Sequence, residues 1–346
     1  MLLRLLSPAY RPSSAHSSAI SGKQYRVRCV RRSSMTSENL FSKVRKPANS
    51  RLCNVSSYTT ELLEIEADDR KLHVLFIPGN PGVIAFYKDF LEALFELLDG
   101  VASITAIGHI SHTKRDWENG RLFSMQDQID HKIDFIRQEL RNSEVPIILV
   151  GHSIGSYISI ETLKRLQEKV IYCIALYPFL ALNPISTWQP IIGTIAASSF
   201  LSAVVSFIVA LLGMLPKWAL RLIVLKSFGR SWSSTAVEAA CSQLPRYHLM
   251  RNVLFMTMTE FKELLERPDW TFMRGSKDKI TFLFGDDDHW GPLQMFEEIS
   301  EQVPNIAISV EREGYTHNFS CTEAGSVWVA QHVANLIKSQ IPTSGK

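Results

Sequence analysis

Short apolar runs alternate with segments of helical spacing through two blocks of the chain. The runs that predict strands cover residues 58–67, 72–77, 101–107, 146–150, 170–176, 280–284 and 306–310. The segments whose apolar residues recur every three or four positions, and that predict helices, are residues 85–98, 125–141, 155–169, 292–302 and 324–338. Because apolar strands that alternate with helices indicate a parallel sheet with both faces covered, we expect an α/β fold.

This alternation divides the chain into a core and two other parts. Residues 51–178 and 277–346 predict one α/β domain, and residues 179–276 form an insertion within it. Residues 1–50 precede the first predicted strand and add nothing to the predicted sheet.

Composition supports a folded chain and excludes several classes of function. Hydrophobic residues make up 46% of the 346 residues and charged residues 21%, which leaves ample apolar material for a core. The net charge of +3 gives no reason to expect a nucleic-acid partner. The five Cys residues are scattered without a CxxC pair, which favours a reducing compartment. The sequence has no Gly-rich phosphate loop, HExxH sequence or zinc-type spacing, so we expect no cofactor and no metal.

A serine lies in the sharp turn between the strand at 146–150 and the helix at 155–169. The sequence GHSIG, centred on Ser153, is a GxSxG motif in the strand–turn–helix context of a nucleophile elbow. Gly151 and Gly155 have no Cβ to collide with the neighbouring strand and helix, so the turn can lift the Ser153 hydroxyl clear of the backbone. We therefore predict that Ser153 is a catalytic nucleophile; the alternative is a loop serine whose glycines serve only packing.

Two backbone N–H groups are candidates for an oxyanion hole. In hydrolases with this motif one donor is the residue after the nucleophile, here Ile154, and the other follows an early sheet strand. The sequence PGNPG at residues 78–82 follows the strand at 72–77. Pro81 has no N–H to donate, so Asn80 is the predicted second donor, unless the loop is an ordinary turn.

A base and an acid are expected after the serine, on loops that follow late strands. His317 comes just after the strand at 306–310 and is the predicted general base. His332 lies within a predicted helix, and His109 with His112 resembles an HxxH metal pair that lacks a third ligand. We expect that pair to lie on a surface loop instead.

The acid lies in the loop at residues 284–292, after the strand at 280–284. Asp286, Asp287 and Asp288 are adjacent there, and residue chemistry alone does not choose among them. One of them is expected to orient the His317 imidazole, which takes the Ser153 proton while the serine attacks an acyl carbonyl. Water then hydrolyses the acyl-enzyme.

With these pieces in place, the chain resembles the lipid droplet-associated hydrolase family of the α/β-hydrolase superfamily. The resemblance covers about residues 55–340 and rests on PGNPG at 78–82, GHSIGSY around Ser153 and the acid loop. That loop fits the family pattern of Gly, two variable residues, Asp, one residue, Trp, one residue and Pro. The pattern singles out Asp288 as the acid, with His317 following 29 residues later.

The resemblance also carries expectations about activity and place. It implies an α/β-hydrolase fold with a long hydrophobic cap or membrane-hairpin insertion. Members of the family are placed on lipid droplets and the endoplasmic reticulum, and sterol esters or acylglycerols are proposed as their substrates. The basic residues at 1–50 depart from the family pattern.

The insertion is the most hydrophobic part of the chain. No charged residue occurs between Val170 and Pro216, and a helix over 191–215 would be about 37 Å long, enough to cross a bilayer core. Ser153 precedes this segment, whereas Asp288 and His317 follow it. Because the three must meet on one side of a membrane, the number of crossings must be even.

Two full crossings are unfavourable for this sequence. They would place Lys217 and Arg221 in hydrocarbon, at about 2.5–3.5 kcal/mol each near the bilayer centre. A hairpin in one leaflet, or helices lying in the interface, avoids that cost. We therefore predict that about residues 184–225 associate with a membrane or a lipid droplet; the alternative is a hydrophobic cap over the acyl pocket of a soluble lipase.

The amino terminus is basic and rich in serine. Residues 1–37 carry seven Lys or Arg, nine Ser and no Asp or Glu, which is typical of an organelle transit peptide. A disordered basic tail fits the same counts, and Met35 offers a second start that would omit most of the segment.

Together these features predict a serine ester hydrolase that acts on neutral lipid esters at a droplet or endoplasmic reticulum surface. Two rival hypotheses are a weakly active or non-catalytic droplet protein that handles lipid, and a soluble esterase imported into a plastid or mitochondrion.

Overall fold

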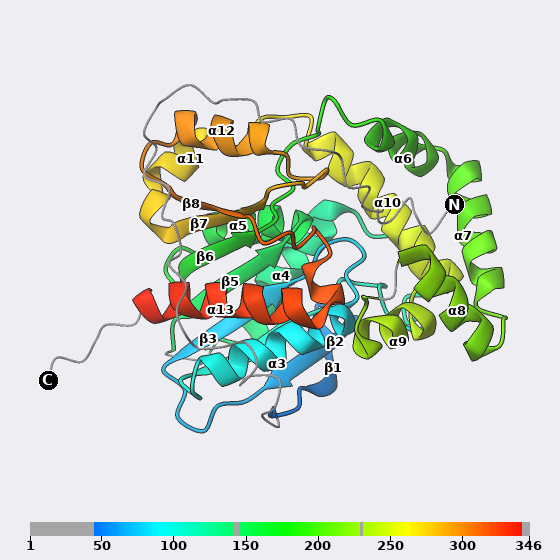
Figure 1. The fold of residues 1–346 in the computed structure, drawn as a ribbon, viewed down its shortest axis with the longest axis horizontal. Coiled ribbons are helices and arrows are strands. Elements are labelled where there is room, and N and C mark those ends of the chain that lie inside the picture. Colours follow the sequence, from blue (N-terminus) through cyan, green and yellow to red (C-terminus); the bar gives the residue numbers. More distant parts are fainter. Residues whose placement is uncertain (1–44, 142–144, 229–230, 341–346) are drawn as a thin grey trace, which may run out of the picture.

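An eight-stranded sheet forms the centre of the computed structural model, which describes residues 45–141, 145–228 and 231–340 (Figure 1). Its strands are β1 (Asn49–Val55), β2 (Tyr58–Ile65), β3 (Leu72–Ile77), β4 (Ala102–Ile107), β5 (Ile147–His152), β6 (Val170–Leu176), β7 (Ile280–Gly285) and β8 (Ala307–Glu311). The strand order is β1-β2-β4-β3-β5-β6-β7-β8. β1, β2 and β4 pair antiparallel, and all neighbours from β4 through β8 are parallel, which confirms the predicted α/β class.

Helices cover both faces of this sheet. α3 (Lys88–Leu97) and α13 (Glu323–Gln340) pack on one face, and α4 (Met125–Glu139), α5 (Ile154–Arg165) and α12 (Leu293–Gln302) pack on the other. β3 shows why its sequence is continuously apolar. Val74 and Phe76 belong to the core on the α3 side, whereas Leu75 and Ile77 belong to the core on the α4 side.

The inserted region consists of six helices between β6 and β7 among the described residues. They are α6 (Trp188–Ala197), α7 (Ser199–Leu212), α8 (Lys217–Phe228), α9 (Ser234–Ser242), α10 (Tyr247–Glu263) and α11 (Trp270–Gly275). α10 contacts α6 and α7 on one side and α4 on the other. In Figure 1, α6, α7 and α8 therefore form an outer layer beyond α10.

The hydrophobic segment of the insertion is broken rather than continuous. Ser198 ends α6 and caps α7, because its hydroxyl accepts a hydrogen bond from the Leu201 N–H at 3.3 Å. The chain bends by 100° between these helices. Within the described ranges no single helix has the length and hydropathy to cross a membrane, whereas α6 and α7 taken together reach those limits.

The structure adds one strand that the sequence pattern does not predict. β1 begins at Asn49, inside the segment that the pattern left outside the sheet, and most of its residues are exposed. It pairs with β2 through a tight turn at Ser56 and Ser57, both of which have positive φ. Most of the predicted targeting segment, residues 1–44, lies outside the described residues.

Candidate active site

Ser153 occupies the tight turn between β5 and α5. Its backbone has φ 57° and ψ −125°, a strained conformation for a residue with a side chain. The turn is held in place by the Ser153 N–H, which donates to the Leu176 carbonyl at 3.0 Å. A Cβ on Gly155 would collide with the Ile77 carbonyl, so glycine is needed where α5 approaches β3. The backbone around Ser153 therefore has the conformation of the predicted nucleophile elbow.

His317 and Asp288 meet beside this turn. The Nδ1 atom of His317 lies 2.8 Å from Oδ2 of Asp288, whose other carboxyl oxygen accepts the Trp290 N–H at 2.8 Å. Asp288 is buried, whereas Asp286 and Asp287 are exposed. The structure thus brings Asp288, and neither neighbouring aspartate, to the imidazole. His317 and Ser153 line the same cavity.

His152 links the site to the core through a chain of hydrogen bonds. Its Nε2 donates to the His317 carbonyl at 2.9 Å, so its Nδ1 accepts from the Tyr87 hydroxyl at 2.8 Å. Tyr87 in turn accepts the Gly79 N–H at 3.2 Å. Burial lowers the pKa of His152 well below its usual value, which keeps the ring neutral as this chain requires. The sequence pattern gives no sign of this link between His152 and His317.

The two predicted oxyanion donors lie on the cavity wall next to Ser153. Asn80 and Ile154 both line the cavity, and the peptide N–H of each has no hydrogen-bond partner among the described residues. Gly79, by contrast, already donates its N–H to Tyr87. Asn80 is therefore the residue of this loop whose N–H stays available at the cavity.

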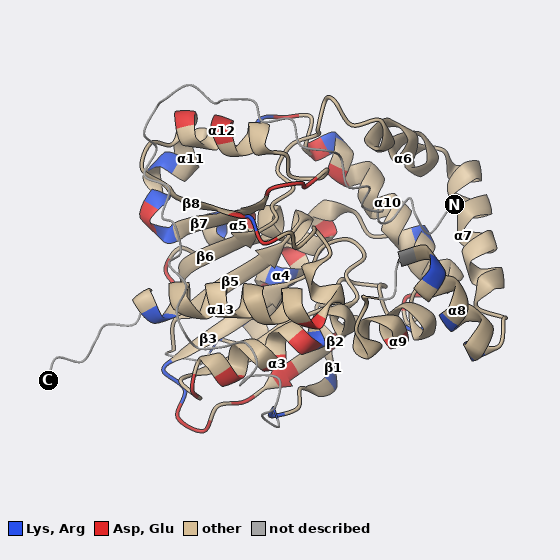
Figure 2. Ribbon diagram, in the orientation of Figure 1, with Lys and Arg blue, Asp and Glu red and all other residues tan. Residues whose placement is uncertain are grey.

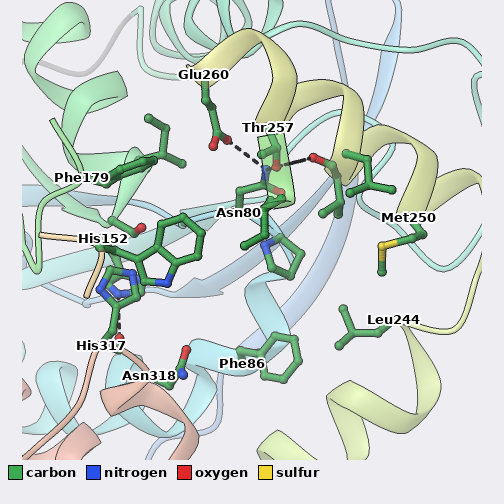
Figure 3. A pocket seen from close by; sticks show the side chains of 18 of the residues that line it. Asn80, Phe86, His152, Phe179, Leu244, Met250, Thr257, Glu260, His317 and Asn318 are labelled. Atoms are coloured by element: carbon green, nitrogen blue, oxygen red, sulfur yellow. Dashed lines mark hydrogen bonds between the residues drawn. The ribbon is translucent and has the colours of Figure 1, made fainter. Parts of the chain in front are cut away.

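The side chain of Asn80 joins this loop to the inserted helix α10. Its Nδ2 lies 3.1 Å from the Val253 carbonyl, 3.0 Å from Thr257 Oγ1 and 2.9 Å from Glu260 Oε1. Figure 3 shows the amide directed at α10, away from His317. The cap and the proposed oxyanion hole are thus connected directly.

A buried histidine pair supports the same loop from the other side. His112 Nδ1 accepts the Gly82 N–H at 2.8 Å, and the Gly82 carbonyl accepts the His109 N–H at 3.2 Å. Both rings are 1% exposed, so the prediction of a surface loop is wrong for this pair. Burial lowers the pKa of His112 to about 3, which preserves it as an acceptor. The described residues hold no cluster of three or more potential metal ligands.

The cavity itself is largely apolar. It has a volume of about 150 Å³ and extends from Ser153 to side chains of α6, α7 and α10 and to Trp232 and Leu244, which flank α9. Phe86, Leu244 and Met250 face it in Figure 3. This lining suits a hydrocarbon chain near the serine.

Comparisons with known proteins show the family of this chain. A family model described as "Lipid-droplet associated hydrolase" matches residues 70–320, most of the chain. The chain belongs to the lipid droplet-associated hydrolase family. Proteins named "Lipid droplet-associated hydrolase" from Gallus gallus and Homo sapiens are each 26% identical to it, over 267 and 274 residues. Each alignment covers 72% of this chain and 80% of the relative.

Solved structures share the fold of this family member. A peroxisomal alpha-beta-hydrolase from Saccharomyces cerevisiae superposes with a TM-score of 0.61 at 12% identity, covering 88% of this chain and 92% of that one. An epoxide hydrolase from Vigna radiata gives 0.59 at 17% identity, covering 84% and 99%. The predicted α/β-hydrolase fold is confirmed. Family and fold together also confirm the predicted class of enzyme, a hydrolase, while the roles of individual residues stay predictions.

Proposed function

We propose that this protein is a serine hydrolase that cleaves lipid esters, either sterol esters or acylglycerols, at the surface of lipid droplets or of the endoplasmic reticulum. The observation that carries the proposal is the pairing of buried Asp288 with half-buried His317 beside the strained Ser153 turn, in the wall of an apolar cavity. No cofactor enters the proposed reaction.

The proposed reaction gives a role to each residue of the triad. Asp288 accepts the Nδ1 proton of His317, which leaves Nε2 as the base that takes the Ser153 proton. The serine oxygen then attacks the ester carbonyl. The oxyanion that forms accepts hydrogen bonds from the backbone N–H groups of Asn80 and Ile154. The alcohol leaves with the proton from His317, and water releases the fatty acid from the acyl-enzyme.

The inserted helices supply the proposed contact with lipid. On α7 the buried residues are Ser202, Ser206 and Val209, while large apolar side chains such as Phe200 and Phe207 are 74% and 58% exposed. Ser202 Oγ accepts from Arg251 of α10 at 2.8 Å, so the serine face is the one that packs on the protein. A helix with its apolar side outward is suited to an apolar surface.

Neighbouring residues extend this outward apolar face. Met214 is 80% exposed and Trp218 is 69% exposed, and Figure 2 shows α6 and α7 without a charged residue. Lys217 and Arg221 of α8 are exposed as well, and basic side chains beside an apolar face suit phospholipid headgroups. We therefore propose that residues 184–225 lie in one leaflet or in the monolayer of a droplet rather than spanning a membrane.

The two faces of α6 and α7 connect the surface with the site. Ile192 and Val205 line the cavity, whereas Ile191 and Val204, one residue earlier, are exposed. One wall of helices thus separates an apolar surface from an apolar cavity. We propose that lipid passes between these helices and so reaches Ser153 from the droplet without crossing water.

Turnover on artificial droplets tests this proposal. Oleate esters in a triolein core under a phospholipid monolayer should be hydrolysed by the wild type and by Ser339→Ala, an exposed control, but not by Ser153→Ala. Equal binding of all three proteins to the droplets, with no ester cleaved by any, would favour a non-catalytic lipid-handling protein.

A further inference from the structure

Glu260 is an acidic residue in the wall of the apolar cavity. It lies near the end of α10 and is only 3% exposed, yet it lines the same space as Ser153 and His317. In Figure 3 its side chain descends from α10 toward Asn80. The mechanism described above does not use this carboxyl group.

The two carboxyl oxygens of Glu260 have different surroundings. Oε1 accepts a hydrogen bond from Asn80 Nδ2 at 2.9 Å, whereas Oε2 has no partner among the described residues. Burial raises the pKa of Glu260 to about 8, so the carboxyl is protonated at neutral pH. Because Oε1 accepts the hydrogen bond from Asn80, the proton is on Oε2, which is then a hydrogen-bond donor without an acceptor among the described residues.

Asn80 does not need this carboxyl as an acceptor for its side-chain N–H groups. The amide has two N–H protons, and the Val253 carbonyl and Thr257 Oγ1 already lie at 3.1 and 3.0 Å. Glu260 is thus a third acceptor for two protons. Glu260 thus has more hydrogen-bonding capacity than the protein uses. Its side chain is part of the wall of the proposed substrate cavity.

We propose that Glu260 binds a free hydroxyl group in the alcohol part of the substrate. The proposal rests on the proposed ester hydrolysis at Ser153 and narrows its substrates to esters with a nearby hydroxyl, such as mono- and diacylglycerols. Sterol esters and triacylglycerols have no free hydroxyl to offer. A hydroxyl both donates and accepts, which matches a protonated carboxyl that has one donor and one spare lone pair.

The position of Glu260 fits a hydroxyl close to the scissile bond. Asn80 offers its backbone N–H to the proposed oxyanion and touches Glu260 with its side chain. Only the side chain of Asn80 therefore separates Glu260 from the proposed oxyanion hole. The carbons of a glycerol group next to the ester can bridge this separation. An ester without the hydroxyl would cover the carboxyl and leave its polar atoms unpaired, which disfavours binding.

Two esters with the same acyl chain test this inference. 1-Oleoylglycerol and propyl oleate both have a three-carbon alcohol, but only the first has free hydroxyls. In mixed micelles of one composition, the full-length wild type should show a kcat/KM at least about 10-fold higher for 1-oleoylglycerol. Glu260→Leu should bring that ratio close to one, mainly by slowing 1-oleoylglycerol hydrolysis.

Variants separate recognition from positioning. Glu260→Gln should keep most of the preference, because an amide also has a donor and an acceptor. Glu263→Leu, an exposed residue on the same helix, should leave the ratio unchanged. If Glu260→Leu slowed both esters in the same proportion, Glu260 would only position Asn80 and the inference would be wrong.

Labelling of Ser153 by a fluorophosphonate distinguishes the two proposals. A labelled wild-type enzyme that cleaves both esters equally well would overturn hydroxyl recognition alone. A wild type that is neither labelled nor active on either ester would overturn the proposed function, and this inference with it.

Discussion

Strand β3 and helix α7 are both strongly apolar, yet they lie in opposite surroundings. All six residues of β3 are buried, including His73, between two layers of helices. On α7 the buried residues are two serines and a valine, and most of the large apolar side chains are exposed. Hydropathy alone therefore does not decide which residues are inside the protein. The position of the few polar residues on α7 decides it, since Ser202 and Ser206 face α10.

We propose different roles for the sheet and for the inserted helices. The sheet holds Ser153, Asp288 and His317 at fixed positions at the ends of its strands, and α6–α8 provide a surface that suits lipid. Substitutions in the sheet loops should therefore change chemistry, and substitutions on the outer face of α7 should change location.

The largest effect is expected at Asp288, the proposed acid of the triad. Asp288→Asn should lower kcat by about 10⁴-fold, because the amide no longer fixes the His317 tautomer that leaves Nε2 free. Steady-state hydrolysis of a soluble short-chain ester measures this without a lipid surface. Asp286→Asn and Asp287→Asn are matched controls in the same loop and should stay within about 2-fold of the wild type. Loss of activity in either control, with Asp288→Asn active, would move the acid to another residue.

The next largest effect concerns the outer face of α7. Replacing Phe200 and Phe207 together by Ser should weaken droplet binding by about 100-fold, because two large apolar side chains lose their contact with lipid. Flotation with artificial droplets measures binding, and activity on a soluble ester should persist. Leu52→Ser, at an exposed leucine on β1, is the control and should float like the wild type. Unchanged flotation of the double variant would remove α7 from the binding surface.

A smaller effect sharpens the inside–outside assignment on α7. Ser206 is fully buried, so Ser206→Leu should lower the free energy of unfolding by about 1–3 kcal/mol through overpacking against the protein. Val204→Leu adds a methylene group at an exposed position two residues away and should change it very little. Denaturant titration of the purified proteins compares them. The reverse order of stabilities would mean that the serine face is not the packed one.

The effect that is smallest at neutral pH is a pH dependence in the sheet. Burial, with a lesser contribution from Arg70, lowers the pKa of His73 to about 4. The unfolded chain binds a proton on this ring near pH 6.5 and the folded protein does not, so stability should fall as pH drops from about 6.5 to 4. His73→Leu should lessen that slope by about 1.4 kcal/mol per pH unit. Parallel slopes for the two proteins in urea titrations at several pH values would exclude His73 as a source.

Much of the fold could be predicted from the sequence because its strands are buried on both sides. β3 and β6 begin and end where the apolar runs do, and the Ser153 turn has an unambiguous motif. β1 escaped prediction because an exposed edge strand carries no apolar run. The bend at Ser198 escaped it as well, because one capping serine hardly alters the mean hydropathy of the segment.

The site could be predicted only where a motif or a strand end marked it. The positions of Ser153 and His317 followed from strand ends, but choosing Asp288 over its neighbours needed the family pattern. Glu260 was missed because an acidic residue on a helix of mixed charge is usually solvated. Its burial depends on how α10 packs on the loop of Asn80, a tertiary contact between residues 180 positions apart.

Fluorophosphonate labelling of the full chain on artificial droplets, with Ser153→Ala beside the wild type, tests the catalytic role of Ser153 most directly. We predict that the wild type is labelled at Ser153 and that Ser153→Ala, folded and bound to the same droplets, is not. A wild type that binds the droplets but remains unlabelled, or a Ser153→Ala variant that is labelled as strongly, would contradict a catalytic serine at this elbow.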